Sequence, residues 1–264
     1  MAVTYRSRTE IAGIRKAGQV VMSILAELRA AVRPGVTTAA LDAIATAGLA
    51  RHHARSNFKD YSPHPGVPPF PGVICASVND EIVHGIPGTH VLKEGDIIAI
   101  DFGAIVDGWH GDSAITLPVG AVAPEAARLL AVTQEALRRG IAQARADNHV
   151  SDISRAIQTY VEGEGMSLVR QYGGHGIGRA LHEDPHISNV VEPRAPDLRL
   201  RPGLVICIEP MVNLGGPATR EQRDHWTVVT ADGSLSAHFE HTVAITQGDP
   251  QVLTDLAVEE ARTA

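Results

Sequence analysis

The first fifty residues place their apolar side chains at a helical period. These side chains recur every three or four positions, as on the buried face of an amphipathic helix, and they are Ile11, Ile14, Ala17, Val21 and Leu25. A Pro-Gly break and threonines suited to capping follow, and a second helix is predicted from about Ala39.

The same period returns in the middle of the chain, where residues 124–145 and 151–164 predict two more helices. Gly163 and Gly165 close the second of these helices. Between the two helix pairs, residues 51–72 are rich in His, Pro and Gly and predict a long loop. A loop of this length inside a compact domain is often functional.

Two segments share one pattern of polar and apolar positions. Residues 92–101 (LKEGDIIAID) and 200–209 (LRPGLVICIE) both run from Leu and a base through Gly into apolar residues that end in a carboxylate. Each segment predicts a loop and a buried strand that delivers an acid. We therefore expect a single domain, residues 1–264, built from two similar α/β halves of about 1–118 and 119–250. A chance match is the alternative, because Gly before an aliphatic strand is common.

The first of these strands ends at Asp101, and Asp112 follows eleven residues later. An Asp-Gly pair at 107–108 is a strong hairpin signal. The resulting register places Asp112 opposite Gly103 and Asp101 diagonally beside Asp112. Two acids on one face repel unless a cation lies between them, and Gly103 leaves room for one. The alternative is that one acid is exposed and the other caps a backbone amide.

Two further acids, Glu209 and Glu240, also lie in strand-like segments. Either of them alone is most simply explained as half of a structural salt bridge. Few Arg or Lys residues are candidates for buried partners, so together with Asp101 and Asp112 they predict a metal cluster. Four carboxylates carry enough charge for two divalent ions, which act on one oxygen nucleophile in two-metal hydrolytic sites.

Histidines cluster in YGGHGIGRALHEDPHI, residues 172–187. His175 lies in a Gly-rich loop, where the backbone can approach a site closely, and His182 follows. The letters HEDPH (182–186) match the H-E-x-x-H zinc signature. That signature requires a helix, in which Pro185 would cost about 3 kcal/mol, so a mononuclear zinc site is not expected. The glycine spacing also differs from the G-x-G-x-x-G of a dinucleotide turn.

A second His-Gly-Ile sequence begins at His84, within NDEIVHGIPG. If the two halves are related, His84 and His175 both face the central site. Cys75 lies nine residues before His84. No acidic orienting group accompanies this pair, so a Cys-His nucleophile has no support in the sequence.

Composition narrows the classes of function. The hydrophobic fraction of 44% and the charged fraction of 20% over 264 residues are ordinary for a soluble globular protein. A formal net charge of −7 argues against a nucleic-acid binder. Two cysteines give no disulfide framework, and no signal peptide or bilayer-spanning apolar run is present. A cytoplasmic protein is therefore expected.

These residues fall in segments that resemble the type I methionine aminopeptidases in their short bacterial form. The segments are VNDEIVHGIP, IDFGAIVDGWHGDSA, GGHGIGRALHEDP, IEPMVN and HWTVVTADGSLSAHFEHTVAIT, and the resemblance covers about residues 5–254. It implies the pita-bread fold, an α/β (α+β) fold of two pseudo-symmetric halves with a curved antiparallel sheet covered by helices.

The resemblance also implies two divalent metal ions, either Mn, Fe(II), Co or Zn. Asp112 and Glu240 would bridge the two ions, and Asp101 would chelate one of them. His175 and Glu209 would complete the shell of the other ion. Asn79 and Ser236 occupy the positions of a monovalent cation site that is sometimes present in relatives.

The implied enzyme is a hydrolase, a metallo-exopeptidase that removes an N-terminal methionine when the second residue is small. A hydroxide bridging the ions would attack the scissile carbonyl, and Glu209 would relay the proton as the catalytic acid/base. His182 would stabilise the oxyanion. His84 would contact the amide nitrogen as the leaving amine forms.

The methionine pocket is expected to be apolar. Its candidate walls are Phe70, Cys75, Leu181 and Trp226, although core packing alone would account for each. Leu181 stands where an aromatic residue is frequent in the family. The Pro-rich loop before Phe70 also departs from the family's pattern.

The expected substrate is the N-terminal methionine of nascent polypeptides, met near the ribosome by a monomer. Neither a membrane nor a specific nucleic acid is expected as a partner. Two alternatives remain. An Xaa-Pro-type pita-bread peptidase usually carries a separate N-terminal domain, for which 264 residues leave no room. A non-catalytic peptide-binding protein on the same fold would have lost metal ligands, whereas this chain retains them.

Overall fold

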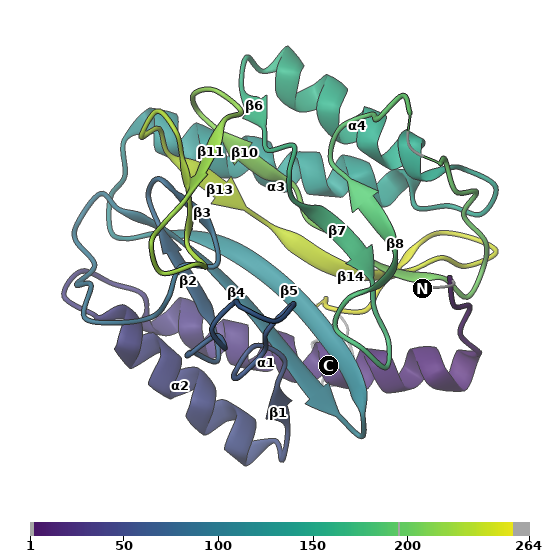
Figure 1. Ribbon diagram of the computed structural model, residues 1–264, viewed down its shortest axis with the longest axis horizontal. Helices are drawn as coiled ribbons and strands as arrows, with labels where there is room; N and C mark the ends of the chain where they lie inside the picture. Colours follow the sequence, from purple (N-terminus) through teal and green to yellow (C-terminus); the bar gives the residue numbers. More distant parts are fainter. Residues whose placement is uncertain (1–2, 195, 256–264) are drawn as a thin grey trace, which may run out of the picture.

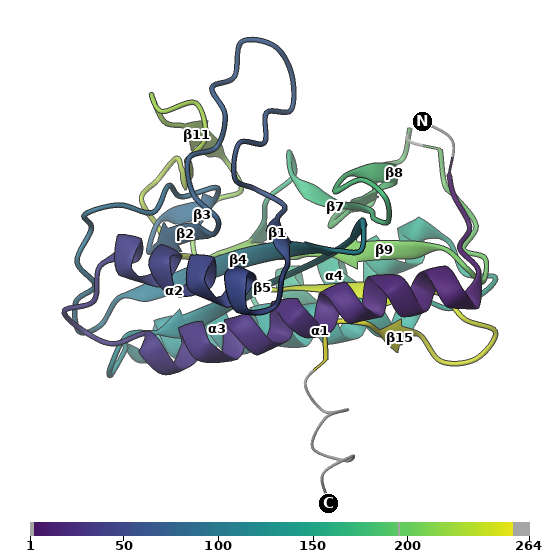
Figure 2. The same ribbon diagram turned by 90° about the horizontal axis from the view of Figure 1, so that it is seen from below.

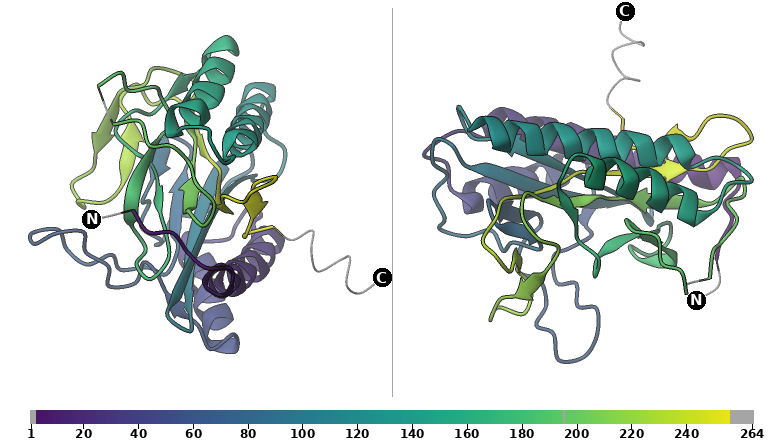
Figure 3. Two further views of the ribbon diagram at one scale, coloured as in Figure 1. Left: turned by 90° about the vertical axis from the view of Figure 1, so that its right-hand side faces the viewer. Right: turned by 90° about the horizontal axis from the view of Figure 1, so that it is seen from above.

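Four helices cover one face of a central antiparallel sheet in a computed structural model that describes residues 3–194 and 196–255 (Figure 1). The helices are α1 (Arg8–Ala31), α2 (Thr38–Arg51), α3 (Pro124–Gln143) and α4 (Val150–Gly163). The loop around residues 57–72 projects from the opposite side of the sheet, as Figure 2 and the left view of Figure 3 show. One face of the sheet is thus closed by helices, and loops line the other.

The four predicted helices are confirmed, with ends that lie within a few residues of the expected ones. α1 begins with a capping box, because the Ser7 hydroxyl accepts from the Glu10 amide and the Glu10 carboxylate accepts from the Ser7 amide. α4 ends at Gly163, and Gly165 beyond it has a φ of +73°, a conformation that favours glycine.

The strands of the described residues are short except for two of ten residues each, β4 and β5. Their bounds are β1 (Arg55–Ser56), β2 (Cys75–Val78), β3 (Glu81–Val83), β4 (Ile97–Val106), β5 (Trp109–Pro118), β6 (Ser167–Leu168), β7 (Gly173–Gly176), β8 (Glu183–Ser188), β9 (Val205–Ile208), β10 (Met211–Asn213), β11 (Thr219–Glu221), β12 (Val228–Thr230), β13 (Ser236–His238), β14 (Glu240–Ala244) and β15 (Gln251–Val252).

Nine of these strands form the central sheet. Its main path is β1-β4-β5-β14-β9-β7-β8, with β2 paired to β4 and β15 to β14. Two three-stranded sheets, β13-β10-β6 and β11-β12-β3, flank it. The neighbours β5, β14 and β9 bring the first and second parts of the chain together at the centre of the sheet.

The β4–β5 hairpin has the register that the Asp-Gly pair predicts. Asp107 and Gly108 have φ values of +52° and +76°, as a tight turn between twisted strands requires. Asp112 pairs with Gly103, and Asp101 pairs with the residue two positions after Asp112. Asp101 and Asp112 are therefore diagonal neighbours on one face, as expected.

The two segments that share a sequence pattern also share a local structure. Gly95 and Gly203 have φ values of +91° and +95° and occupy the turns before β4 and β9. The Gly95 amide donates to Val119 O at 3.0 Å, and the Gly203 amide donates to Ile245 O at 3.0 Å. Equivalent turns at equivalent places support the pseudo-symmetry of the fold, while the boundaries of the two halves stay a prediction.

Two expectations about local structure differ in their outcome. The prediction that residues 51–72 are entirely loop is wrong at the start of the segment, because Arg51 ends α2 and Arg55–Ser56 pair with β4 as β1. A short strand of this kind depends on backbone pairing with β4, which the composition of the segment does not indicate. The HEDPH segment lies mostly in β8 rather than in a helix, which agrees with the rejection of a zinc-helix signature.

The apolar core fills the space between the helices and the sheet. Leu25 and Leu28 of α1, Ile98 and Ile100 of β4, and Ile153 of α4 are all essentially inaccessible to solvent. Burial of such side chains is the main driving force for the packing of the two layers. None of the described helices has a stretch long and apolar enough to cross a bilayer.

Candidate metal centre and substrate cavity

A cavity of about 510 Å³ lies beside the central sheet, and all of the predicted catalytic, metal-binding and pocket residues line it. They are Phe70, Cys75, His84, Asp101, Asp112, His175, Leu181, His182, Glu209, Trp226 and Glu240. The fold thus brings these residues together from widely separated segments of the chain. Their individual roles stay predictions.

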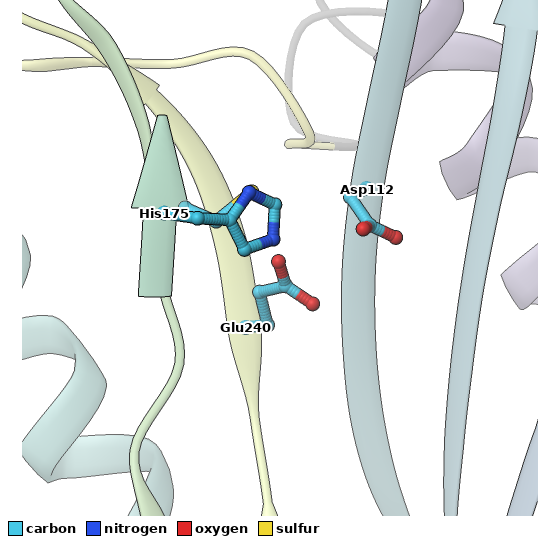
Figure 4. Close-up of side chains that lie close together, drawn as sticks. Asp112, His175 and Glu240 are labelled. Carbon is cyan, nitrogen blue, oxygen red and sulfur yellow. The ribbon is translucent and has the colours of Figure 1, made fainter. Parts of the chain in front are cut away.

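Three carboxylates meet over the middle strands of the sheet. Asp101, Asp112 and Glu240 lie on β4, β5 and β14, and Figure 4 shows Asp112 and Glu240 on neighbouring strands, with the His175 ring reaching toward them from a third strand. Oδ1 of each Asp and Oε1 of Glu240 are buried and lack a hydrogen-bond partner among the described residues. A buried carboxylate oxygen without a donor is costly unless a cation compensates it.

His175 on β7 presents an unprotonated nitrogen to these carboxylates. Its Nδ1 lies 2.9 Å from the carbonyl oxygen of Gly176. A carbonyl can only accept, so Nδ1 carries the proton and Nε2 keeps its lone pair. Nδ1–H donation to a backbone carbonyl is the arrangement that orients metal-ligating histidines.

Glu209 lies at the end of β9, between two histidines. Its Oε1 lies 3.7 Å from Nε2 of His175, and its Oε2 lies 3.7 Å from Nε2 of His238. Both histidines are neutral near pH 7, because burial lowers the pKa of each to about 3. Glu209 therefore gains no charged partner from either imidazole.

Burial shifts the pKa values of the carboxylates upward. The pKa of Asp101 rises to about 7 by burial. The pKa of Glu209 rises to about 8 by burial and by repulsion from Asp101. Burial and neighbouring acids also raise the pKa values of Asp112 and Glu240 well above their ordinary range. Four crowded acids at one site are what a divalent cation would stabilise in their ionised form.

The donor set fits divalent metal ions. One donor atom each from Asp112, His175, Cys207 and Glu240 lies within 4.8 Å of the others. Carboxylate oxygens and one neutral imidazole suit Mn, Fe(II), Co or Zn, and the added thiol is a softer donor. Asp101 and Glu209 line the same cavity.

Two other histidines flank the carboxylates. His84 follows β3 with a φ of +60°, and its ring makes edge contacts with Tyr172 and Trp226 at 5.9 and 6.0 Å. Burial lowers the pKa of His84 to about 4. The ring of His182 lies 4.4 Å from that of His175, centroid to centroid, and its Nδ1 lies 2.8 Å from the Tyr61 hydroxyl.

The predicted pocket walls form one apolar side of the cavity. Phe70 and Trp226 make an edge contact, with centroids 5.1 Å apart. The indole N–H of Trp226 donates to Pro68 O at 2.8 Å, which joins this wall to the Pro-rich loop. Cys75 and Leu181 are buried in the same apolar cluster and line the cavity. The cavity thus combines an apolar recess with a polar floor, as small-molecule sites commonly do.

Sequence reasoning missed three residues of this site. Cys207 lies two positions before Glu209 on β9, and this period-2 spacing would have placed it on the same face. His238 lies two positions before Glu240, but on β13 in a different sheet from β14, so strand periodicity does not place it at the site. Tyr61 had no such signal beyond its place in a long loop with potential function.

The comparisons with known proteins agree with this geometry. Residues 12–247 match the profile of Metallopeptidase family M24. The chain belongs to this family. Its pita-bread fold and the resemblance to methionine aminopeptidases are thereby confirmed. Family membership and the cluster of donor atoms together support the use of a divalent metal.

Curated relatives span nearly the whole chain. Methionine aminopeptidase 1 of Bacillus subtilis (strain 168) is 48% identical over 245 residues, which are 93% of this chain and 96% of that protein. The methionine aminopeptidase of Aquifex aeolicus (strain VF5) is 46% identical over 258 residues, 97% of this chain and 100% of that protein. These alignments therefore cover nearly the full length of both relatives.

Solved structures show the same fold. The crystal structure of methionine aminopeptidase from Rickettsia prowazekii has a TM-score of 0.91 at 37% identity, covering 96% of this chain and 100% of that one. An Xaa-Pro dipeptidase from Bacillus anthracis has a TM-score of 0.75 at 21% identity. It covers 95% of this chain but only 62% of its own, and at this identity the likeness concerns the fold alone.

Proposed function

We propose that this protein is a methionine aminopeptidase that releases an N-terminal methionine when the second residue is small. The observation that carries the proposal is a single cavity in which four carboxylates and the free Nε2 of His175 lie beside an apolar wall. Relatives named methionine aminopeptidase, at 48% and 46% identity over nearly the whole chain, support it.

Two divalent ions would be held by Asp101, Asp112, His175, Glu209 and Glu240, which all line the cavity. When bound, such ions activate water and polarise the scissile carbonyl as Lewis acids. Manganese, Fe(II), Co and Zn all suit this donor set.

The chain's own residues bind the substrate and move the protons. Phe70 and Trp226 enclose the methionine side chain and exclude water from it. Glu209 takes a proton from the nucleophilic water and passes it to the leaving amine. His182 donates to the carbonyl oxygen as negative charge develops there, a contribution of about 3 kcal/mol for well-placed donors. His84 contacts the scissile nitrogen.

Further expectations belong to the same proposal. Nascent polypeptides would supply the substrate to a monomer that acts in the cytoplasm, near ribosomes. A monovalent cation beside Asn79 and Ser236 is also proposed. These two residues are neighbours, because the Ser236 amide donates to Asn79 O at 2.9 Å.

Release of free methionine from Met-Ala-Ser and Met-Leu-Ser tests the proposal. Metal-stripped protein would receive Mn, Co, Fe(II) or Zn, with a Glu209→Gln variant as the control. We expect metal-dependent cleavage of Met-Ala-Ser alone, and its loss in the variant. Cleavage of Leu-Pro-Ser instead would indicate an Xaa-Pro peptidase, and binding of peptides without any cleavage would indicate a non-catalytic protein.

A further inference from the structure

Tyr61 forms a hydrogen bond with one of the two substrate-facing histidines. Its hydroxyl oxygen lies 2.8 Å from Nδ1 of His182, and the two rings make an edge contact with centroids 5.4 Å apart. Tyr61 belongs to the Pro-rich loop between β1 and β2, whereas His182 immediately precedes β8. The bond joins segments that are 121 positions apart in the chain.

The backbone holds Tyr61 firmly at the base of this loop. The Asp60 amide donates to Phe70 O, and the Phe70 amide donates to Tyr61 O, both at 2.9 Å. The Tyr61 amide donates to Phe58 O at 2.9 Å. These bonds close the loop beside the apolar wall and fix the backbone from which the Tyr61 side chain extends toward His182.

The partner of Nδ1 decides which nitrogen of a neutral imidazole carries the proton. A neutral histidine has one N–H and one lone pair. Burial raises the pKa of the Tyr61 phenol above its ordinary value, so the phenol keeps its proton near pH 7 and can donate it to Nδ1, which lies 2.8 Å away. A phenol O–H that donates to Nδ1 leaves the proton of His182 on Nε2.

We propose that Tyr61 is a positioning residue for His182: its hydroxyl donates to Nδ1 and thereby keeps His182 as the Nε2–H tautomer that can donate to the substrate's carbonyl oxygen. This inference rests on the proposed function, which makes His182 the oxyanion donor. The opposite tautomer would present a lone pair to the developing negative charge and would repel it. Tyr61 thus acts through His182 and need not touch the reacting atoms.

Steady-state kinetics of Tyr61→Phe test this role, because phenylalanine keeps the ring contact and removes only the hydroxyl. We expect kcat for Met-Ala-Ser to fall about tenfold, the effect of one lost hydrogen bond, with KM changed less than about twofold. Tyr160→Phe is the matched control, since Tyr160 lies on α4 against Arg139. It should leave kcat and KM unchanged, and both variants should keep the thermal midpoint of the wild type.

Nitrogen-15 NMR of the zinc-loaded protein reads the tautomer directly, with His182→Gln used to assign the signals. We expect Nδ1 unprotonated and Nε2 protonated in the wild type, and a shift toward the other tautomer in Tyr61→Phe. A wild type with a protonated Nδ1 would overturn the inference, as would a variant with unchanged kcat and tautomer. If the wild type released no methionine, the proposed function would be wrong. The NMR spectrum would still show whether Tyr61 determines the tautomer of His182, because it does not depend on activity.

Discussion

Gly103 lies directly opposite Asp112 in the β4–β5 hairpin, and a Cβ atom built on Gly103 would lie only 2.8 Å from Oδ1 of Asp112. The same Cβ would lie 2.2 Å from Nδ2 of Asn57, which donates to Gly111 O at 3.1 Å. Real Cβ atoms essentially never come so close to other heavy atoms. The absence of a side chain at 103 therefore keeps room for a carboxylate that is a predicted metal ligand.

Gly103→Ala should weaken metal binding, because Asp112 or Asn57 must move to admit the methyl group. We expect the affinity for Mn²⁺ to fall at least about tenfold and the free energy of unfolding to fall by about 1–3 kcal/mol. Calorimetric titration of metal-stripped protein measures the first effect, and urea unfolding measures the second. Gly163→Ala is the control, since its Cβ would meet nothing within 4 Å. Equal Mn²⁺ affinity in Gly103→Ala and the wild type would refute the argument.

The metal-free protein should lose stability as pH rises through neutrality. With pKa values of about 7 for Asp101 and about 8 for Glu209, the folded state binds protons that unfolded carboxyls, with pKa values of about 4, have already lost. The state that binds more protons loses stability as pH rises. Buried His84 and His175 have pKa values of about 4 and 3. They add the opposite effect, a loss of stability as pH falls, but only below about pH 6.5, where unfolded histidine becomes charged.

We expect the thermal midpoint of metal-stripped protein to fall by several degrees from about pH 6.5 to about pH 8. Asp112→Asn removes one of the crowded charges and should flatten this dependence. Asp107→Asn, an exposed acid paired with Lys16, should leave it unchanged. Saturating Mn²⁺ should raise the midpoint and remove the decline. A midpoint independent of pH in the metal-free wild type would contradict the electrostatic argument.

The surroundings of Asp112 could be predicted from sequence because local rules determine them. An Asp-Gly turn fixes the register of a hairpin, and the register decides which acids share a face. The shared pattern before Asp101 and Glu209 likewise predicted two equivalent turns, which Gly95 and Gly203 form. In each case the signal lies within about ten residues of the structure that it predicts.

Other parts of the site depend on tertiary contacts that no local rule contains. Tyr61 reaches His182 from an irregular loop, where neither helical nor strand periodicity indicates a direction. His238 lies on β13, yet its imidazole approaches Glu209 at the end of β9. Pairing of Arg55–Ser56 with β4 was missed for a similar reason, because a two-residue strand carries too little pattern to be recognised.

A largely buried ion pair, Arg6–Glu183, should matter more than exposed pairs do. Nη2 of Arg6 lies 2.7 Å from Oε1 of Glu183, and the two side chains are only 9% and 14% exposed. The same carboxylate accepts from the amides of Arg179 and Ala180. Removing Arg6 would leave a buried carboxylate without its charged partner, which is strongly destabilising.

Arg6→Ala should therefore lower the free energy of unfolding by about 3 kcal/mol, as measured by urea denaturation. Because Glu183 directly follows His182, we also expect a lower kcat for Met-Ala-Ser. Arg51→Ala is the matched control, since its pair with Glu27 is about half exposed on both sides and should contribute less than about 1 kcal/mol. Similar losses in the two variants would mean that burial does not strengthen the first pair.

The two cysteines should be unreactive in the folded protein. Cys75 and Cys207 are 4% and 0% exposed, and burial together with nearby acids raises the pKa of each thiol well above its ordinary value. Only the thiolate is nucleophilic, so iodoacetamide at neutral pH should label neither cysteine in the native state and both in urea, as counted by intact mass. Tyr5→Cys, at a position that is 41% exposed, should add one rapidly labelled site. Rapid native labelling of Cys75, which lines the cavity, would show that the acids around it do not suppress its ionisation.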